Sequence, residues 1–221
     1  MFTGIIEGRG TIAAISAVQQ GRRFTFAAEF PLADTRIGDS IAVNGVCLTA
    51  VTLSGNRFSA DVSPETLNKT TLGNARIGDR VNMERAMQLS DRIGGHLVSG
   101  HIDGIGWIRE KKSAGNAFRV VIQAPEAVME YVIPKGSVAV DGVSLTVNEC
   151  QGDAFEVSII PHTAAVTTVG VKKANDPVNL EADMIGKYVA HFLSRRKRIP
   201  EEAPPEGRSL DPAFLEKTGF L

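Results

Sequence analysis

Short apolar-rich runs separated by turn signals recur along most of the chain. Asn44-Gly45 and Asp141-Gly142 each lie between two such runs, and Gly55-Asn56 marks a further turn. An Asn-Gly or Asp-Gly pair in this setting predicts a tight hairpin, because both turn residues need positive φ. Several short strands with closely spaced turns indicate small barrels or sandwiches rather than alternating βαβ units. The pattern therefore predicts an all-β fold.

The same pattern occurs twice along the chain. Residues 41–49 (IAVNGVCLT) match residues 138–146 (VAVDGVSLT) with an offset of 97 positions, 142 − 45 for the paired glycines. The register continues in further pairs of segments: residues 70–73 with 167–170, residues 81–84 with 178–181 and, at an offset of 96, residues 3–8 with 99–104. Two long copies predict a duplicated domain and not a solenoid, whose repeats are shorter and more numerous.

Domain boundaries follow from the repeat. We place the first unit at residues 1–88, a polar glycine-bearing linker at 89–97 and the second unit at 98–182. Ser63-Pro64 predicts the start of a brief helix, because serine caps a helix and proline suits its first turn. Pro125 opens a second brief helix in the same manner, extending to Val132.

A terminal helix is predicted after the second unit. Apolar residues recur at helical spacing between Met184 and Leu193, with Asp183 as the cap of a helix over residues 183–199. The apolar stripe can pack on its own barrel or meet copies of itself in an oligomer, and the pattern leaves both open. We expect residues 200–221 to form a mobile tail.

Composition restricts the function. The chain has 24 Lys and Arg against 25 Asp and Glu, so no global field draws it to nucleic acid or to a membrane surface. Cys47 and Cys150 have no neighbours at a metal-site spacing, and we expect reduced thiols and no metal. Without a signal peptide, a membrane span or a nucleotide-binding glycine motif, we expect a cytoplasmic protein with a small-molecule ligand and no bound cofactor.

Equivalent positions in the two units carry different chemistry. The differing pairs are Ile5 and His101, Cys47 and Ser144, Glu65 and His162, and Ala86 and Asp183. The second unit thus gains proton carriers, and a thiol or hydroxyl can add to an electron-poor carbon. Taken singly, each has a structural interpretation, but their coincidence at matched positions favours a site. His96 and His191 lack such support, and we interpret them as structural.

Four segments resemble the riboflavin synthase family: residues 1–7 (MFTGIIE), 44–49 (NGVCLT), 94–104 (GGHLVSGHIDG) and 141–146 (DGVSLT), within a match over residues 1–193. The resemblance implies two tandem six-stranded Greek-key barrels, a C-terminal helix, and a homotrimer held by these helices that could associate with lumazine synthase. It also implies a cofactor-free dismutation of two 6,7-dimethyl-8-ribityllumazine molecules to riboflavin and 5-amino-6-ribitylamino-uracil. The productive site would lie between the first barrel of one subunit and the second barrel of its neighbour.

The resemblance also implies site residues. The first-barrel pocket would contain Gly4, Ile5, Ile6, Cys47, Leu48, Thr49, Asp61, Val62, Ser63, Pro64, Glu65 and Thr66. The second would contain Gly100, His101, Ile102, Lys135, Ser144, Leu145, Thr146, Ile160, Pro161, His162, Thr163, Ala164 and Ala165. Residues 164–166 (AAV) depart from the leucine and charged residue that the family implies there.

Roles for these residues are also implied by the resemblance. His101, with Thr146 or Ser144, would remove the acidic proton of a lumazine 7-methyl group. Cys47 and Asp183 are candidates for nucleophilic assistance and proton transfer, and Phe2 would shape the pocket. The nearest alternatives are an antenna protein that holds a fluorophore on the same fold and the flavin-binding barrel of a reductase, which would need an Arg-x-Tyr-Ser/Thr motif absent from this sequence.

Overall fold

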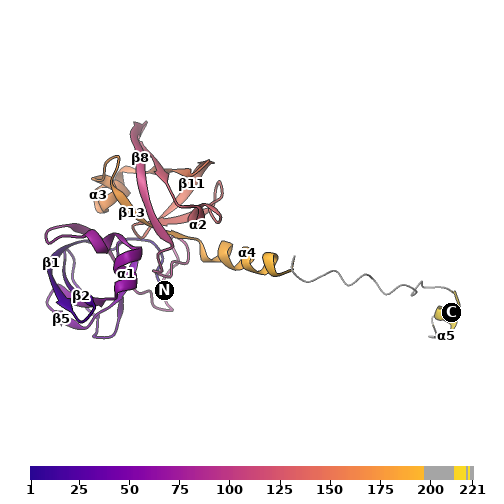
Figure 1. Cartoon of the computed structure of the whole chain (residues 1–221), viewed down its shortest axis with the longest axis horizontal. Helices are drawn as coiled ribbons and strands as arrows, with labels where there is room; N and C mark the ends of the chain where they lie inside the picture. Colours follow the sequence, from indigo (N-terminus) through magenta and orange to yellow (C-terminus); the bar gives the residue numbers. More distant parts are fainter. Residues whose placement is uncertain (197–211, 218, 220–221) are drawn as a thin grey trace. The chain divides into compact units, whose positions relative to one another are not determined.

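The computed structural model describes residues 1–196, 212–217 and 219 (Figure 1). It divides into a compact unit, Met1–Lys187, and a second unit, Tyr188–Leu221. The first unit contains two β-barrels in tandem, which confirms the predicted all-β duplication. No helix among the described residues is long and apolar enough to span a membrane.

The first barrel is built from seven strands in the order β4-β3-β7-β1-β2-β6-β5. Their bounds are β1 Gly8–Val18, β2 Gly21–Ala28, β3 Ser40–Val43, β4 Val46–Thr49, β5 Thr52–Ser54, β6 Arg57–Val62 and β7 Arg80–Arg85. Strands β4 and β5 stand at opposite ends of this order although only Ala50 and Val51 separate them in the chain. The Val51 N–H donates to the Ser59 carbonyl oxygen at 2.8 Å, so this link closes the sheet.

The second barrel is closed by six strands in the order β10-β11-β12-β9-β8-β13. Their bounds are β8 Gly104–Ala114, β9 Ala117–Gln123, β10 Ser137–Val140, β11 Val143–Gln151, β12 Ala154–Ile159 and β13 Pro177–Ala182. Strand β11 occupies the place of both β4 and β5, with a register shift between Val147 and Glu149 where the first barrel is interrupted. The chain therefore follows the same path through both barrels.

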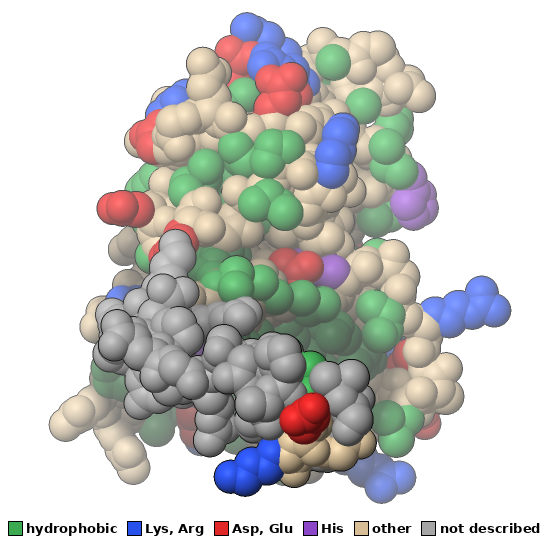
Figure 2. Space-filling view, turned by 90° about the vertical axis from the view of Figure 1, so that its right-hand side faces the viewer, with side chains coloured by type: hydrophobic (Ala, Val, Ile, Leu, Met, Phe, Trp, Pro, Cys, Tyr) green, Lys and Arg blue, Asp and Glu red, His purple; other side chains and the backbone are tan. Residues whose placement is uncertain are grey.

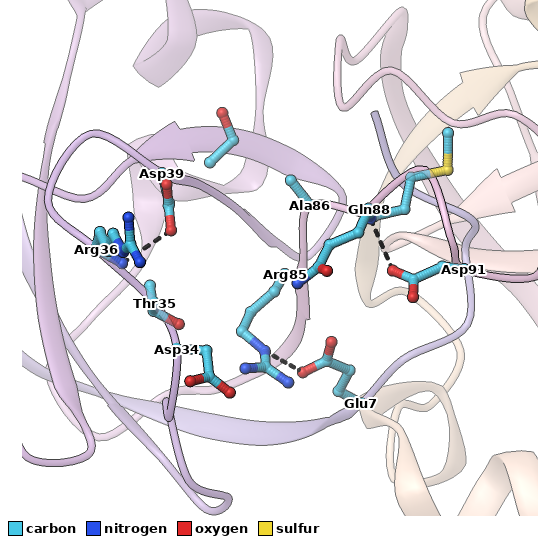
Figure 3. Close-up of a pocket in the computed structure, with 11 residues that line it drawn as sticks. Glu7, Asp34, Thr35, Arg36, Asp39, Arg85, Ala86, Gln88 and Asp91 are labelled. Carbon is cyan, nitrogen blue, oxygen red and sulfur yellow. Dashed lines mark hydrogen bonds and ion pairs between the residues drawn. The ribbon is translucent and has the colours of Figure 1, made fainter.

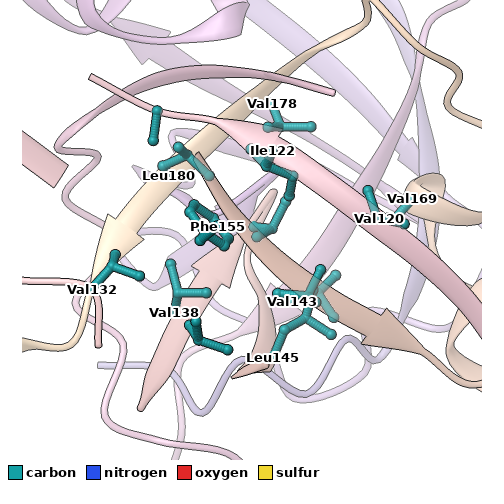
Figure 4. Packing of buried hydrophobic residues seen from close by; sticks show 14 of the residues in the cluster. Val120, Ile122, Val132, Val138, Val143, Leu145, Phe155, Val169, Val178 and Leu180 are labelled. Atoms are coloured by element: carbon teal, nitrogen blue, oxygen red, sulfur yellow. The ribbon is translucent and has the colours of Figure 1, made fainter. Parts of the chain in front are cut away.

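Each barrel has its own apolar core. The first contains the ring pairs Phe24–Phe26 and Phe26–Phe58, with centroids 5.8 and 5.1 Å apart. In the second, Ile122, Phe155 and Leu180 are buried with the valines that Figure 4 shows around them. Alternate residues of each strand supply these side chains, because successive side chains of a strand point to opposite faces.

The predicted turns and short helices are present. Asn44 and Gly45 have φ of 45° and 78°, and Asp141 and Gly142 have φ of 46° and 78°. The Ser63 hydroxyl accepts a hydrogen bond from Thr66 N–H at 3.1 Å and caps α1. The short helices are α1 Pro64–Lys69, η1 Thr71–Asn74, α2 Glu126–Met129, α3 Pro161–Val166 and η2 Thr168–Gly170. Helix α2 ends at Met129, so the predicted extension to Val132 is wrong.

Two buried asparagines join the barrels reciprocally. Asn82 Nδ2 donates to the Asp141 carbonyl oxygen and Asn179 Nδ2 donates to the Asn44 carbonyl oxygen, both at 2.9 Å. The Asn82 Oδ1 accepts from Thr168 N–H at 2.7 Å, and the Asn179 Oδ1 accepts from the equivalent threonine of the first half at 2.8 Å. Since Asn82 and Asn179 are repeat partners, the joint has approximate twofold symmetry within one chain.

Helix α4, Met184–Arg196, follows the second barrel. The Asp183 carboxylate accepts from Ile185 N–H at 2.9 Å, which confirms the predicted cap. The exposed side chains of its apolar stripe are Ile185, Tyr188, Val189, Phe192 and Leu193, each at least half exposed. A further short helix, α5, spans Pro212–Lys217. Residues 197–199 of the predicted helix and 200–211 of the predicted tail lie outside the described residues.

Candidate functional site

The segments that lead into the two units, residues 2–6 and 98–102, are exchanged between the barrels. The Gly4 carbonyl oxygen accepts from Ser144 N–H at 2.8 Å, and the Gly100 carbonyl oxygen accepts from Cys47 N–H at 2.9 Å. Ile6 packs on the second core and Ile102 on the first. The predicted grouping of these two segments was therefore wrong, because a sequence repeat identifies equivalent positions but not which copy of the pocket each one serves.

Two buried glutamates hold these leading segments. Glu84 accepts from the backbone N–H and the hydroxyl of Thr3, both at 2.7 Å, and from Gly4 N–H at 3.1 Å. Glu181 accepts the same three bonds from Ser99 and Gly100, at 2.7, 2.7 and 2.9 Å. Burial raises the pKa of the Glu84 carboxyl, against the opposing effect of these donors. Each leading segment is therefore fixed by an equivalent set of three hydrogen bonds to a buried glutamate.

Glycine is required where the leading segments touch the opposite strands. Gly4 and Gly100 have φ of 75° and 84°, a region that side chains other than glycine's rarely adopt. A Cβ at Gly4 would lie 2.6 Å from the Ser144 Cβ, and one at Gly100 would lie 2.5 Å from the Cys47 Cβ. Phe2 has no exposed surface. It packs with Val98 in a buried cluster that contacts Cys47, so it supports this residue from the core side.

The first pocket is a hollow of about 260 Å³ between β4, α1 and the leading segment of the second unit. Its lining residues are Val46, Cys47, Glu65, Thr66, Lys69, Thr70, Gly100, His101 and Ile102. The structure thus brings together the predicted residues Cys47, Glu65 and Thr66 and adds His101 to them. His101 and Thr49 are both exposed, so a ligand has access to each.

The region of the second unit that the repeat relates to this hollow, which we call the second pocket, has the same frame with other side chains. The repeat and the exchanged contact place Ser144 of β11 beside Gly4, as Cys47 lies beside Gly100. His162 and Thr163 begin α3 as Glu65 and Thr66 begin α1. The further predicted residues around this frame are Ile5, Thr146, Ile160, Pro161 and Ala165, which are exposed, and Ala164, which is half-buried.

His96 is a polar contact of this pocket that the sequence interpretation had assigned to structure. Its Nδ1 lies 2.7 Å from the Ser144 Oγ, and the residue is only 8% exposed. Burial lowers the pKa of the His96 imidazole, and the charge of Asp183 opposes that shift. Position 96 lies in the linker, outside the matched segments of the repeat, so comparison of the two halves offered no signal for it.

Two further predicted residues, Asp61 and Lys135, do not line the first pocket. Asp61 forms two hydrogen bonds with Arg23 at 2.6 and 2.7 Å, and this partner lowers the pKa of its carboxyl. Lys135 is exposed and has a φ of 66°, where its repeat partner is Gly38 with a φ of 97°. A lysine held in this region is strained, a condition that concentrates at functional sites.

A larger hollow, of about 730 Å³, lies elsewhere on the first barrel (Figure 3). It is lined largely by charged side chains, several already paired, such as Arg85 with Glu7 at 2.8 Å. None of the predicted site residues lines it. We place the candidate site at the two repeat-related pockets instead, because the reactive side chains gather there.

Charge gives no indication of a polyanionic ligand. Figure 2 shows one face, on which the described Lys and Arg side chains are scattered among acidic and hydrophobic ones. Nucleic-acid sites typically gather basic residues in one patch. Within the described part of the chain, no three His, Cys, Asp or Glu side chains are grouped to hold a metal ion.

Comparisons with known proteins match this architecture. The lumazine binding domain model matches twice, at residues 3–86 and 99–183. Riboflavin synthase of Actinobacillus pleuropneumoniae is 47% identical over 220 residues, and that of Photobacterium phosphoreum is 43% identical over 224, each alignment covering 100% of both chains. The crystal structure of LumP with 6,7-dimethyl-8-(1'-D-ribityl) lumazine is 26% identical with a TM-score of 0.73, covering 82% of this chain and 99% of LumP.

Proposed function

This chain belongs to the riboflavin synthase family, and we propose that it converts two molecules of 6,7-dimethyl-8-ribityllumazine into riboflavin and 5-amino-6-ribitylamino-uracil. One lumazine gives a four-carbon unit to the other. The observation that carries this proposal is the pair of pockets with one frame and unequal side chains. A reaction between two identical molecules needs two places that bind the same ring and treat it differently.

The side chains fit such a division of labour. The first pocket offers the Cys47 thiol and the His101 imidazole. The second offers the Ser144 hydroxyl and the imidazole of His162. An imidazole can take a proton from an acidic methyl group, and a thiol or hydroxyl can assist at an electron-poor carbon. These roles are proposals for each residue.

Two subunits are needed to pair the predicted catalytic residues. His101 lines the first pocket with Cys47, whereas Thr146 lies on β11, next to Ser144 of the second pocket. We propose that the first pocket of one subunit faces the second pocket of a neighbour, so that His101 and Thr146 meet across the interface. The homotrimer is held by α4, whose apolar stripe spans positions at helical spacing and is exposed in the single chain.

Positioning is expected to outweigh any single group. Holding two reactants in register contributes roughly 7–11 kcal/mol, whereas one well-placed base contributes about 10²–10⁴-fold. Two pockets that each bind one lumazine supply this register once they face each other. No cofactor is expected in the reaction, because the substrate itself serves as donor and acceptor.

The deciding experiment supplies only the lumazine to purified, dialysed protein at neutral pH. Absorbance should show two lumazines lost for each riboflavin formed. Tight fluorescent binding without turnover would instead support an antenna function on the same fold. Replacing Tyr188 and Phe192 with glutamate should give a monomer by sedimentation and abolish turnover while each pocket still binds riboflavin. A cytoplasmic location and an association with lumazine synthase remain predictions.

A further inference from the structure

Ser144 has a hydrogen-bond partner that its repeat partner lacks. His96 Nδ1 lies 2.7 Å from Ser144 Oγ. His96 comes from the linker, just ahead of the second leading segment, and its backbone N–H donates to the Thr3 carbonyl oxygen at 3.1 Å. Within the described residues, no histidine forms a comparable hydrogen bond with Cys47. The linker thus adds a difference between the pockets that the repeat itself does not contain.

The surroundings of His96 select one tautomer. Its Nε2 is buried and has no hydrogen-bond partner among the described residues. Buried N–H groups without a partner are rarer in folded proteins than buried acceptors without one. The imidazole proton therefore belongs on Nδ1, where it is donated to Ser144 Oγ. The hydroxyl hydrogen of Ser144 is then free to point away from His96.

We infer that His96 is a positioning residue that turns Ser144 into a hydrogen-bond donor toward the ligand of the second pocket. The inference rests on the proposed function and specifies how that pocket handles the lumazine ring. Carbonyl oxygens and ring nitrogens of a pteridine accept hydrogen bonds, and they gain negative charge when the 7-methyl group loses its proton. A donor fixed in advance at such an atom stabilises the charged state more than the neutral one.

Neighbouring contacts fix the orientation of the Ser144 side chain. Gly95 lies so close to this pair that a Cβ there would be 2.8 Å from Ser144 Oγ and closer still to the Thr3 carbonyl oxygen. The backbone of Ser144 is fixed by its N–H bond to Gly4 at 2.8 Å. With its backbone and its oxygen both held, Ser144 retains only the rotation of its own hydroxyl hydrogen. His96 is therefore placed to set the one remaining degree of freedom.

Kinetics of full-length variants test the inference. His96→Leu should lower kcat by about tenfold, less than the loss of a whole donor, with a smaller change in KM. His96→Asn, which can still donate an amide hydrogen to Ser144, should recover most of that loss. In a Ser144→Ala background, His96→Leu should cause no further decrease. An equal decrease in both backgrounds, or no decrease in either, would overturn the positioning role.

Nitrogen-15 NMR of histidine-labelled protein tests it without turnover. The chain has four histidines, and the signal lost in His96→Asn identifies His96. We expect the proton on Nδ1 in the natural sequence and a different tautomer mixture in Ser144→Ala. A proton on Nε2 in the natural sequence would refute the inference even if the enzyme is active. If lumazine is bound but not converted, the proposed function fails while the tautomer result still decides this one.

Discussion

Replacing Gly100 with alanine tests the exchange of leading segments. The new Cβ would lie 2.5 Å from Cys47 Cβ and 3.0 Å from Phe2 Cε2, in a backbone with φ of 84°. Gly55→Ala is the matched control, because Gly55 also has a left-handed φ, of 58°, but its new Cβ would have no atom within 4 Å. Both substitutions reduce the entropy of the unfolded chain alike, so that contribution cancels.

The cost of the backbone strain and the cost of the steric clash can be estimated separately. An L residue in the left-handed region costs about 1–2 kcal/mol, which both variants experience. Overpacking a filled contact costs a further ~1–3 kcal/mol, which only Gly100→Ala experiences. At about 2–4 °C per kcal/mol for a chain of this size, Gly100→Ala should melt roughly 2–12 °C below Gly55→Ala.

Thermal unfolding followed by circular dichroism at one fixed protein concentration measures this difference, since oligomer stability depends on concentration. Riboflavin binding should weaken in Gly100→Ala, because the clash displaces Cys47 at the pocket wall, and stay unchanged in Gly55→Ala. Equal melting temperatures for the two variants, with equal riboflavin binding, would refute the close approach of the segment to β4. Normal stability with lost binding would instead show that the pocket, and not the fold, absorbs the clash.

Three further predictions follow from the same structure. Cys47→Ser and His101→Gln should each slow steady-state turnover by about 10²–10⁴-fold without abolishing it; complete loss of activity with ligand binding intact would contradict the dominance of positioning. Asn82→Leu should lower the free energy of unfolding, measured by denaturant titration, by roughly 2–6 kcal/mol, because it leaves the Thr168 N–H and the Asp141 carbonyl oxygen unpaired at 2.7 and 2.9 Å contacts. Burial holds the pKa of His96 below its ordinary value of 6.5, so the unfolded chain takes up the proton first, and stability should fall as the pH drops below that value, with a smaller fall in His96→Gln.

Local features could be predicted from the sequence because local chemistry determines them. The two hairpins follow from Asn44-Gly45 and Asp141-Gly142, and the cap of α4 follows from Asp183 before an apolar stripe. The duplication itself was visible because the register persists over long segments. The comparison of matched positions then identified Cys47 and Ser144 as unequal partners, and the structure places both beside exchanged glycines.

Long-range features could not be predicted in this way. The exchange of residues 2–6 and 98–102 depends on backbone bonds between distant strands, and either arrangement would give the same sequence repeat. The division of one strand into β4 and β5 leaves no local signal, since Ala50 and Val51 resemble ordinary strand residues. His96 lies outside the repeat and gained its importance only from the position of Ser144.

The joint between the barrels shows how such unequal pockets can arise on an equal frame. Asn44 and Asp141 are repeat partners that accept the same backbone bond, each at 2.8 Å. Of these two residues, only Asp141 is acidic. Lys172 pairs with its carboxylate at 2.6 Å, where the first half has Ala75. A charge and its partner thus change together while the backbone contact persists. At the pockets, likewise, the carbonyls of Gly100 and Gly4 accept from Cys47 N–H and Ser144 N–H at 2.9 and 2.8 Å, so the two side chains could diverge without disturbing the frame.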